Sequence, residues 1–145
     1  MPEALAQLQH NVDENWNADD ADEARPRPTV CKLCWGEPLP PSLGSFDLVL
    51  VADCVYDPKL YAPLARTLAD IAPTSETTVL LANLDRHGSE PTFFRDLAAA
   101  GFALEAIEGY EEEALAACDA RASDRFFFFR AARSLGGAAP VAQPP

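Results

Sequence analysis

An acid and a phenol follow directly after the most strand-like segment of the chain. Residues Phe46 to Val51 are mostly apolar and β-prone, as in a parallel strand buried on both faces, and Asp53 and Tyr56 come just after its end at Ala52. In open α/β sheets, ligands bind just beyond the carboxyl ends of such strands. A carboxylate there can orient a nucleophile or stabilise developing positive charge, so both side chains are candidates for chemistry.

Each of these two residues also has a structural alternative. Asp53 could cap the helix that follows, which is a common role for aspartate. Asp57 directly precedes Pro58 and is better placed for that cap. Tyr56 could pack against Leu60 of the same helix. The sequence favours the functional role for Asp53 and Tyr56 over these structural ones.

The elements that must position these residues alternate along the chain. Apolar residues at three- and four-residue steps predict helices, whereas short apolar or alternating runs predict strands. The predicted helices are residues 2–15, 59–72 and 90–100, and the predicted strands are 29–33, 46–51, 77–82, 102–107 and 125–131. Such alternation predicts an α/β sheet of mostly parallel strands. The connection between the last two strands is too short and acidic for a crossover, so we expect these strands to form a closing antiparallel hairpin.

The charge of the chain excludes some classes of partner. The 145 residues carry a formal net charge of −12. Non-specific binding to nucleic acid or to an anionic membrane needs a basic face, so neither is expected. The acidity is compatible with a basic protein substrate, although solubility alone also explains it. No window of about 18 apolar residues occurs, so no membrane-spanning segment is predicted.

The compartment follows from the amino terminus and the cysteines. The first residues lack a basic start followed by a long apolar run, so no secretory signal is predicted. Four cysteines in such a chain indicate a reducing compartment, and we expect a cytoplasmic or nuclear protein.

Cys31-x-x-Cys34 has a spacing that could bind zinc or support thiol exchange. A zinc site needs about four ligands, and the remaining cysteines and histidines are scattered along the chain. In a strand at residues 29–33, positions 31 and 34 would point to opposite faces. We therefore predict no metal site and keep a thiol or zinc protein as a minority alternative.

Leu33-Cys34-Trp35-Gly36, the strand at 46–51, Asp53-x-x-Tyr56 and the helix after it form an ordered set. In this order and spacing they resemble the class I, seven-strand S-adenosylmethionine-dependent methyltransferases. The closest resemblance is to the group that methylates lysine side chains of proteins (the methyltransferase 16 family), and it runs from about residue 2 to about residue 131. It implies a partial Rossmann-like sheet, S-adenosyl-L-methionine as cofactor and a protein lysine as substrate.

The resemblance also implies roles for four residues. Trp35 would lie against the adenine of the cofactor, and Ala52 would border the cofactor with its small side chain. Asp53 would face the methyl donor and the incoming nitrogen. Tyr56 would close the pocket for the acceptor with its ring or hydroxyl.

The domain is expected to be incomplete. Methyltransferases of this class begin with a strand that leads into a Gly-x-Gly-x-Gly loop, and no such loop occurs among the seven glycines. We expect residues 1–133 to be the C-terminal part of the domain and residues 134–145 to be a disordered tail. The strand at 46–51 would then present an apolar edge or pair directly with 29–33. The alternative function is a non-catalytic fragment or interaction module without cofactor.

Overall fold

The computed structural model describes residues 2–16, 26–84, 90–109 and 126–134 of the chain. It divides into two units, Met1–Cys34 and Trp35–Pro145, which are described separately. The predicted tail lies outside the described residues, apart from Ser134. Within the described part of the chain, no helix is long and apolar enough to span a membrane.

In the described part of the first unit, helix α1 (Pro2–Asn15) forms where the periodicity predicts it. Its described side chains are mostly exposed, and the amide of Gln7 donates to Asn11 one turn along the helix. Residues 26–34 form neither helix nor strand, so the strand predicted at Thr29–Leu33 is wrong. A strand forms where its backbone groups pair with a neighbouring strand, and the described residues of this unit contain none.

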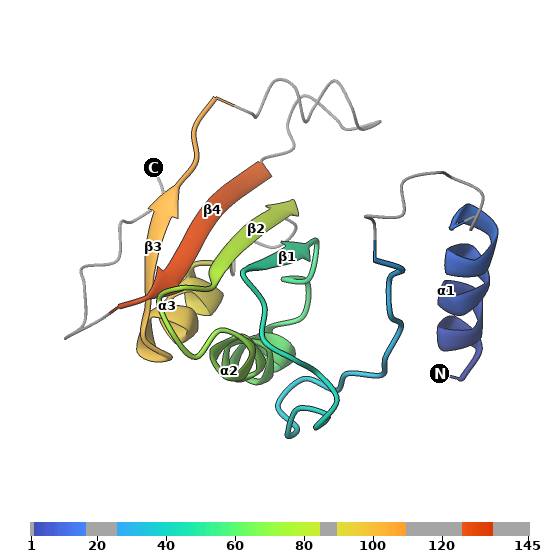
Figure 1. Cartoon of the computed structure of the whole chain (residues 1–145). Coiled ribbons are helices and arrows are strands. Elements are labelled where there is room, and N and C mark those ends of the chain that lie inside the picture. Colours follow the sequence, from blue (N-terminus) through green and yellow to red (C-terminus); the bar gives the residue numbers. More distant parts are fainter. Residues whose placement is uncertain (1, 17–25, 85–89, 110–125, 135–145) are drawn as a thin grey trace. The chain divides into compact units, whose positions relative to one another are not determined.

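The second unit is built on a four-stranded sheet (Figure 1). Its strands are β1 (Leu48–Ala52), β2 (Thr78–Leu84), β3 (Phe102–Ala106) and β4 (Phe126–Arg133), in the order β1-β2-β4-β3. The pair β1–β2 is parallel, whereas β4 runs antiparallel to both β2 and β3. Three strands therefore share one direction, and the predicted α/β fold with a closing antiparallel pair is confirmed.

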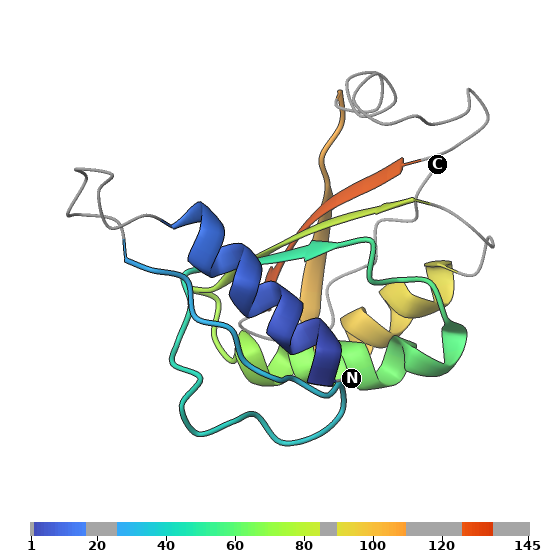
Figure 2. The same ribbon diagram turned by 90° about the vertical axis from the view of Figure 1, so that its right-hand side faces the viewer.

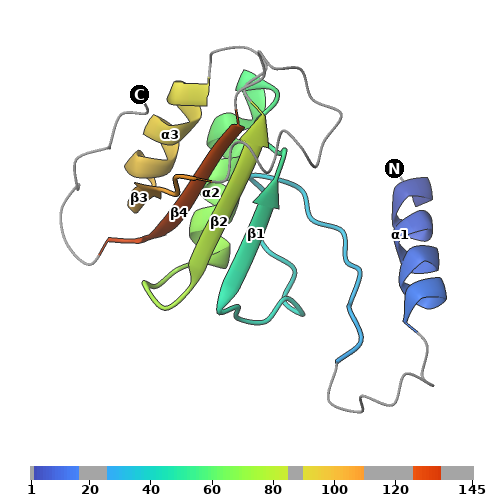
Figure 3. The ribbon, with the colours of Figure 1, turned by 90° about the horizontal axis from the view of Figure 1, so that it is seen from above.

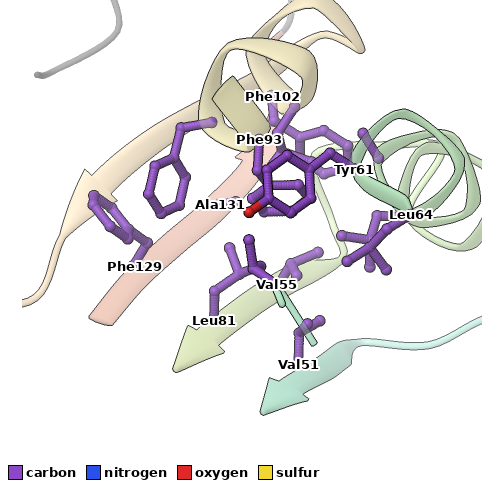
Figure 4. Close-up of a cluster of buried hydrophobic side chains, with 14 of the residues drawn as sticks. Val51, Val55, Tyr61, Leu64, Leu81, Phe93, Phe102, Phe129 and Ala131 are labelled. Carbon is purple, nitrogen blue, oxygen red and sulfur yellow. The ribbon is translucent and has the colours of Figure 1, made fainter. Parts of the chain in front are cut away.

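Helices α2 (Tyr61–Ile71) and α3 (Glu90–Ala99) cover one face of the sheet, as Figures 2 and 3 show. A short 3-10 turn, η1 (Pro58–Leu60), leads into α2, and α3 follows β2. The core between helices and sheet is rich in aromatic rings, with the ring centroids of Tyr61 and Phe93 5.7 Å apart. Figure 4 shows this cluster. The largest fully buried side chains of the described residues are Tyr61, Phe93, Leu97, Val55, Val79 and Thr67.

One expectation about β1 is wrong. Its apolar sequence predicts burial on both faces, but Leu48 and Leu50 are 50% and 71% exposed, and only Val51 is buried. The reason is topological. β1 is the edge strand of the described sheet, and α2 and α3 cover only one face of that sheet, which is not the face of Leu48 and Leu50. The predicted apolar edge is therefore present in the described sheet, and residues 29–33, the predicted alternative partner of β1, form no strand.

Candidate active site

The chain turns sharply where β1 ends. The backbone N–H of Asp53 donates to the carbonyl of Ala82 over 2.8 Å, which extends the pairing with β2 by one residue. Asp53 then adopts a φ of +50°, the left-handed region that aspartate tolerates better than most residues. This turn takes the chain out of the sheet and leaves Ala52 and Asp53 exposed at the carboxyl end of β1.

The residues after the turn are fixed from two sides. The side chain of Val55 is 2% exposed and packs into the core (Figure 4). Its backbone N–H donates to Oδ1 of Asn83 over 3.0 Å, and its carbonyl accepts from Nδ2 of the same side chain at 3.3 Å. Buried Asn83, near the end of β2, thus holds the loop that carries Asp53 and Tyr56.

Asn83 is a residue that the sequence analysis did not identify. Its only signal is a polar side chain near the end of an otherwise apolar strand, TVLLANL. A role for Asn83 can be inferred only once the parallel pairing of β1 and β2 is known, because this pairing places the end of β2 beside the loop after β1.

Tyr56 and Trp35 meet although they lie on different loops. Their ring centroids are 6.3 Å apart at a tilt of 50°, and the Tyr56 side chain is 47% exposed. Trp35 packs against the core and is partly buried. Next to it, the N–H of Gly36 donates to Oγ1 of Thr67 on α2 over 2.7 Å. The Trp35 turn is therefore attached to the helix that follows the Asp53 loop.

The helix cap is made by Asp57 and not by Asp53. The Asp57 side chain accepts a hydrogen bond of 3.0 Å from the backbone N–H of Lys59, at the start of η1. The predicted capping role of Asp57 is confirmed. The structural alternative for Asp53, that of an N-cap, does not apply.

The pKa of the Cys54 thiol responds to the negative charge of the neighbouring Asp53. The Sγ of Cys54 donates to the carbonyl of Ala52 at 3.3 Å. Burial raises the pKa of the Cys54 thiol, and the negative charge of Asp53 raises this pKa further, while hydrogen bonding from the Ala52 backbone to the thiolate form acts in the opposite direction. The thiol therefore remains protonated at neutral pH, and the carboxylate of Asp53 supplies the negative field at this end of β1.

The structure brings the four predicted site residues to one region of the second unit. Ala52, Asp53 and Tyr56 lie at and after the end of β1, and Trp35 contacts Tyr56. The roles of these residues remain predictions. Cys31 is exposed and Cys34 is partly buried, and within the described ranges no three His, Cys, Asp or Glu residues gather as a metal site would require.

Comparison with known proteins assigns the chain to a class. Residues 1–100 match the lysine methyltransferase family, so the chain belongs to this family. It is 36% identical over 113 residues to EEF1A lysine methyltransferase 3 of Mus musculus. This match covers 77% of the chain but 46% of the mouse protein. The chain thus spans less than half the length of this relative.

Proposed function

We propose that this chain is the C-terminal part of an S-adenosylmethionine-dependent protein-lysine N-methyltransferase. The observation that carries the proposal is the joint placement of Asp53 at the carboxyl end of β1 and of Trp35 against Tyr56, in a chain of the lysine methyltransferase family. Ligands of open α/β sheets bind at this end of the strands.

The residues present fit one side of the cofactor. The indole of Trp35 offers a flat surface for an adenine ring, and the small, exposed Ala52 allows close approach to the strand end. When bound, S-adenosylmethionine supplies a methyl group on a sulfonium. In this proposal Trp35 binds the adenine, and Ala52 leaves room for the donor beside Asp53.

Asp53 and Tyr56 would act on the lysine. An ammonium has no lone pair, so the lysine must be neutral before it attacks the methyl group. The carboxylate of Asp53 orients the amine and stabilises the positive charge that develops on the nitrogen. The exposed Tyr56 ring lies tilted against Trp35 and would exclude water from the acceptor side when the lysine is bound.

A protein lysine is the proposed acceptor. The mouse relative is named for the lysine methylation of EEF1A, which makes EEF1A the first substrate to test. The net charge of −12 favours encounter with a basic protein surface. We propose a cytoplasmic or nuclear site of action, in keeping with the reducing environment that the cysteines indicate.

The second candidate is a methyltransferase-like module that binds no cofactor. It is favoured by the sequence, because none of the seven glycines forms the Gly-x-Gly-x-Gly loop of the class. The two candidates differ in a single measurable property, the affinity for the cofactor or its product.

The test is a calorimetric titration with S-adenosylhomocysteine, performed on this chain and on a form extended by an upstream Gly-rich segment. We expect saturable binding that Trp35→Ala weakens by about fivefold or more, since ring stacking contributes at least about 1 kcal/mol. Trp16→Ala is the matched control, because Trp16 lies in the other unit. Absence of binding in both forms would favour the module without cofactor.

Activity is measured in the form that binds. We expect Asp53→Asn to lower kcat for methyl transfer to EEF1A by about 100-fold, the range seen when one electrostatic group is removed from a reacting centre. Asp57→Asn is the control. It also removes one negative charge, but at the helix cap, and asparagine retains the capping hydrogen bond. Equal rates for Asp53→Asn and the unmodified protein would exclude the role assigned to Asp53.

A further inference from the structure

Asn83 lies on the buried face of β2, where the neighbouring side chains of the strand are apolar. Along β2, Val79, Leu81 and Asn83 alternate onto the buried face, and Asn83 is 5% exposed. An unpaired amide at such a position would destabilise the fold, whereas an aliphatic side chain would add to the core. The amide therefore needs hydrogen-bond partners that offset the cost of removing it from water.

Among the described residues, the side chain of Asn83 is hydrogen-bonded to three backbone groups. Oδ1 accepts from the N–H of Val55 at 3.0 Å, and Nδ2 donates to the carbonyl of Val55 at 3.3 Å and to the carbonyl of Leu84 at 2.8 Å. One side chain thus satisfies both polar backbone groups of Val55 and ties them to β2. Val55 belongs to no helix or strand, so the regular backbone hydrogen bonds of such elements do not satisfy its N–H and carbonyl.

Val55 lies between the two residues proposed to act on the lysine. It follows Asp53 by two positions and directly precedes Tyr56. Its side chain is locked in the core, and Asn83 fixes the orientation of its peptide groups. Upstream, the hydrogen bond from Asp53 to Ala82 fixes the loop to the same strand. The backbone from Asp53 to Tyr56 is therefore held by β2 at two points.

We infer that Asn83 is a positioning residue, whose amide holds the Val55 backbone and so sets Asp53 and Tyr56 in the geometry for methyl transfer. This inference rests on the proposed function. Asn83 acts through Val55 and is not expected to touch the cofactor or the lysine. Removal of the amide loosens the loop without removing either functional side chain.

The chain offers a closely matched control at the other end of the same strand pair. The hydroxyl of Thr77, 5% exposed, donates to the carbonyl of Phe46 over 2.7 Å. Thr77 therefore also joins the β2 segment to the β1 segment by a partly buried hydrogen bond from a side chain to the backbone. Asn83→Leu and Thr77→Val each replace such a group with an apolar side chain of similar shape.

The first measurement is hydrogen exchange at the Val55 amide, followed by NMR in the 145-residue chain. In the unmodified protein we expect this loop amide to be protected. Asn83→Leu should accelerate its exchange by about tenfold or more, because the hydrogen bond to Oδ1 is lost. Thr77→Val should leave Val55 unchanged. If Asn83→Leu does not fold, Asn83→Ser provides the same comparison, since its shorter side chain cannot bridge both groups of Val55.

The second measurement is methyl transfer by the form of the protein that binds S-adenosylhomocysteine. We expect Asn83→Leu to lower kcat by about tenfold or more, with KM for S-adenosylmethionine within about threefold, because positioning errors of this kind act mainly on the chemical step. Thr77→Val should retain kcat, even where both variants lower the free energy of unfolding by similar amounts.

Each of three outcomes would overturn the inference. An unprotected Val55 amide in the unmodified chain, or equal protection in Asn83→Leu, would show that Asn83 does not hold the loop. Accelerated exchange with kcat equal to that of Thr77→Val would show that the loop is held but that its position does not matter for transfer. A protein that transfers no methyl group would refute the proposed function and the catalytic part of this inference, while the exchange experiment would still decide whether Asn83 holds Val55.

Discussion

At the scale of single residues, the region after β1 combines a fixed charge with a half-buried thiol. Asp53 lies in the left-handed region of φ, where a residue other than glycine costs about 1 kcal/mol or more. Aspartate is among the residues that tolerate this conformation, and the turn presents its carboxylate beside Cys54. Cys54 is therefore an internal probe of the Asp53 charge.

We expect Asp53→Asn to accelerate alkylation of Cys54 by iodoacetamide at a fixed pH below the pKa of the thiol. Asp53 is the second cause of the raised Cys54 pKa, so its removal lowers that pKa and increases the thiolate fraction. Burial, the larger cause, remains, so the increase should be smaller than the roughly tenfold change that a full pKa unit gives. The measurement is a time course of peptide masses.

Two controls accompany this experiment. Cys31 is exposed in the other unit, and its alkylation rate should not change. Asp57→Asn removes a nearby charge that does not contribute to the raised Cys54 pKa, so it should leave Cys54 unaffected. An unchanged Cys54 rate in Asp53→Asn would contradict the electrostatic coupling.

The candidate residues differ in how far the sequence could identify them. Asp53 and Tyr56 are predictable because a buried strand, its end and the next helix are all local features of the chain. Trp35 was identified as a site residue only by a family resemblance, and its contact with Tyr56 was not predicted. Asn83 was not predictable, since its partner Val55 lies 28 residues away and is brought to it by strand pairing.

At the scale of elements, the turn at Gly36 joins the Trp35 segment to α2. Gly36 has a φ of +82°, and a Cβ at this position would lie 3.2 Å from Cβ of Pro63. Its N–H donates to Thr67, whose hydroxyl in turn donates to the carbonyl of Pro63 at 3.0 Å. Only glycine combines this backbone conformation with this close approach.

We expect Gly36→Ala to lower the free energy of unfolding by about 1–2 kcal/mol, because alanine is strained at positive φ and crowds Pro63. The same change should shift Trp35 relative to Tyr56, which Trp35 fluorescence detects in a Trp16→Phe background. Unfolding in urea gives the free energy. Gly44→Ala is the control, since nothing lies within 4 Å of a Cβ at Gly44. Equal stability of the two variants would contradict this account of Gly36.

The elements show where sequence patterns succeed and where they fail. Periodicity predicts α1, α2 and α3 to within a few residues because each helix has its own local pattern. β1 begins two residues later than predicted, at Leu48, where pairing with Thr78 begins. The strand predicted at Thr29–Leu33 fails because strand formation depends on a partner, which the segment itself does not contain.

At the scale of the whole molecule, the described sheet has an apolar edge. The fold class follows from the alternation of strands and helices, but the insertion of β4 between β2 and β3 has no local signal. The same order leaves β1 at the edge, with Leu48, Leu50 and the neighbouring Phe46 exposed. Exposed apolar edge strands are templates for association with other strands.

We expect the isolated chain to self-associate through β1, and Leu50→Lys to reduce this association, because a lysine on an edge strand must be desolvated when another strand pairs with it. Leu8→Lys is the matched control: Leu8 is 52% exposed on α1, and both substitutions add the same charge. Since the chain carries a net charge of −12, an added positive charge reduces the general repulsion between chains. A lower association state in Leu50→Lys alone, measured by sedimentation velocity, must therefore arise at the edge. A monomeric unmodified chain with a cooperative thermal transition would contradict this prediction.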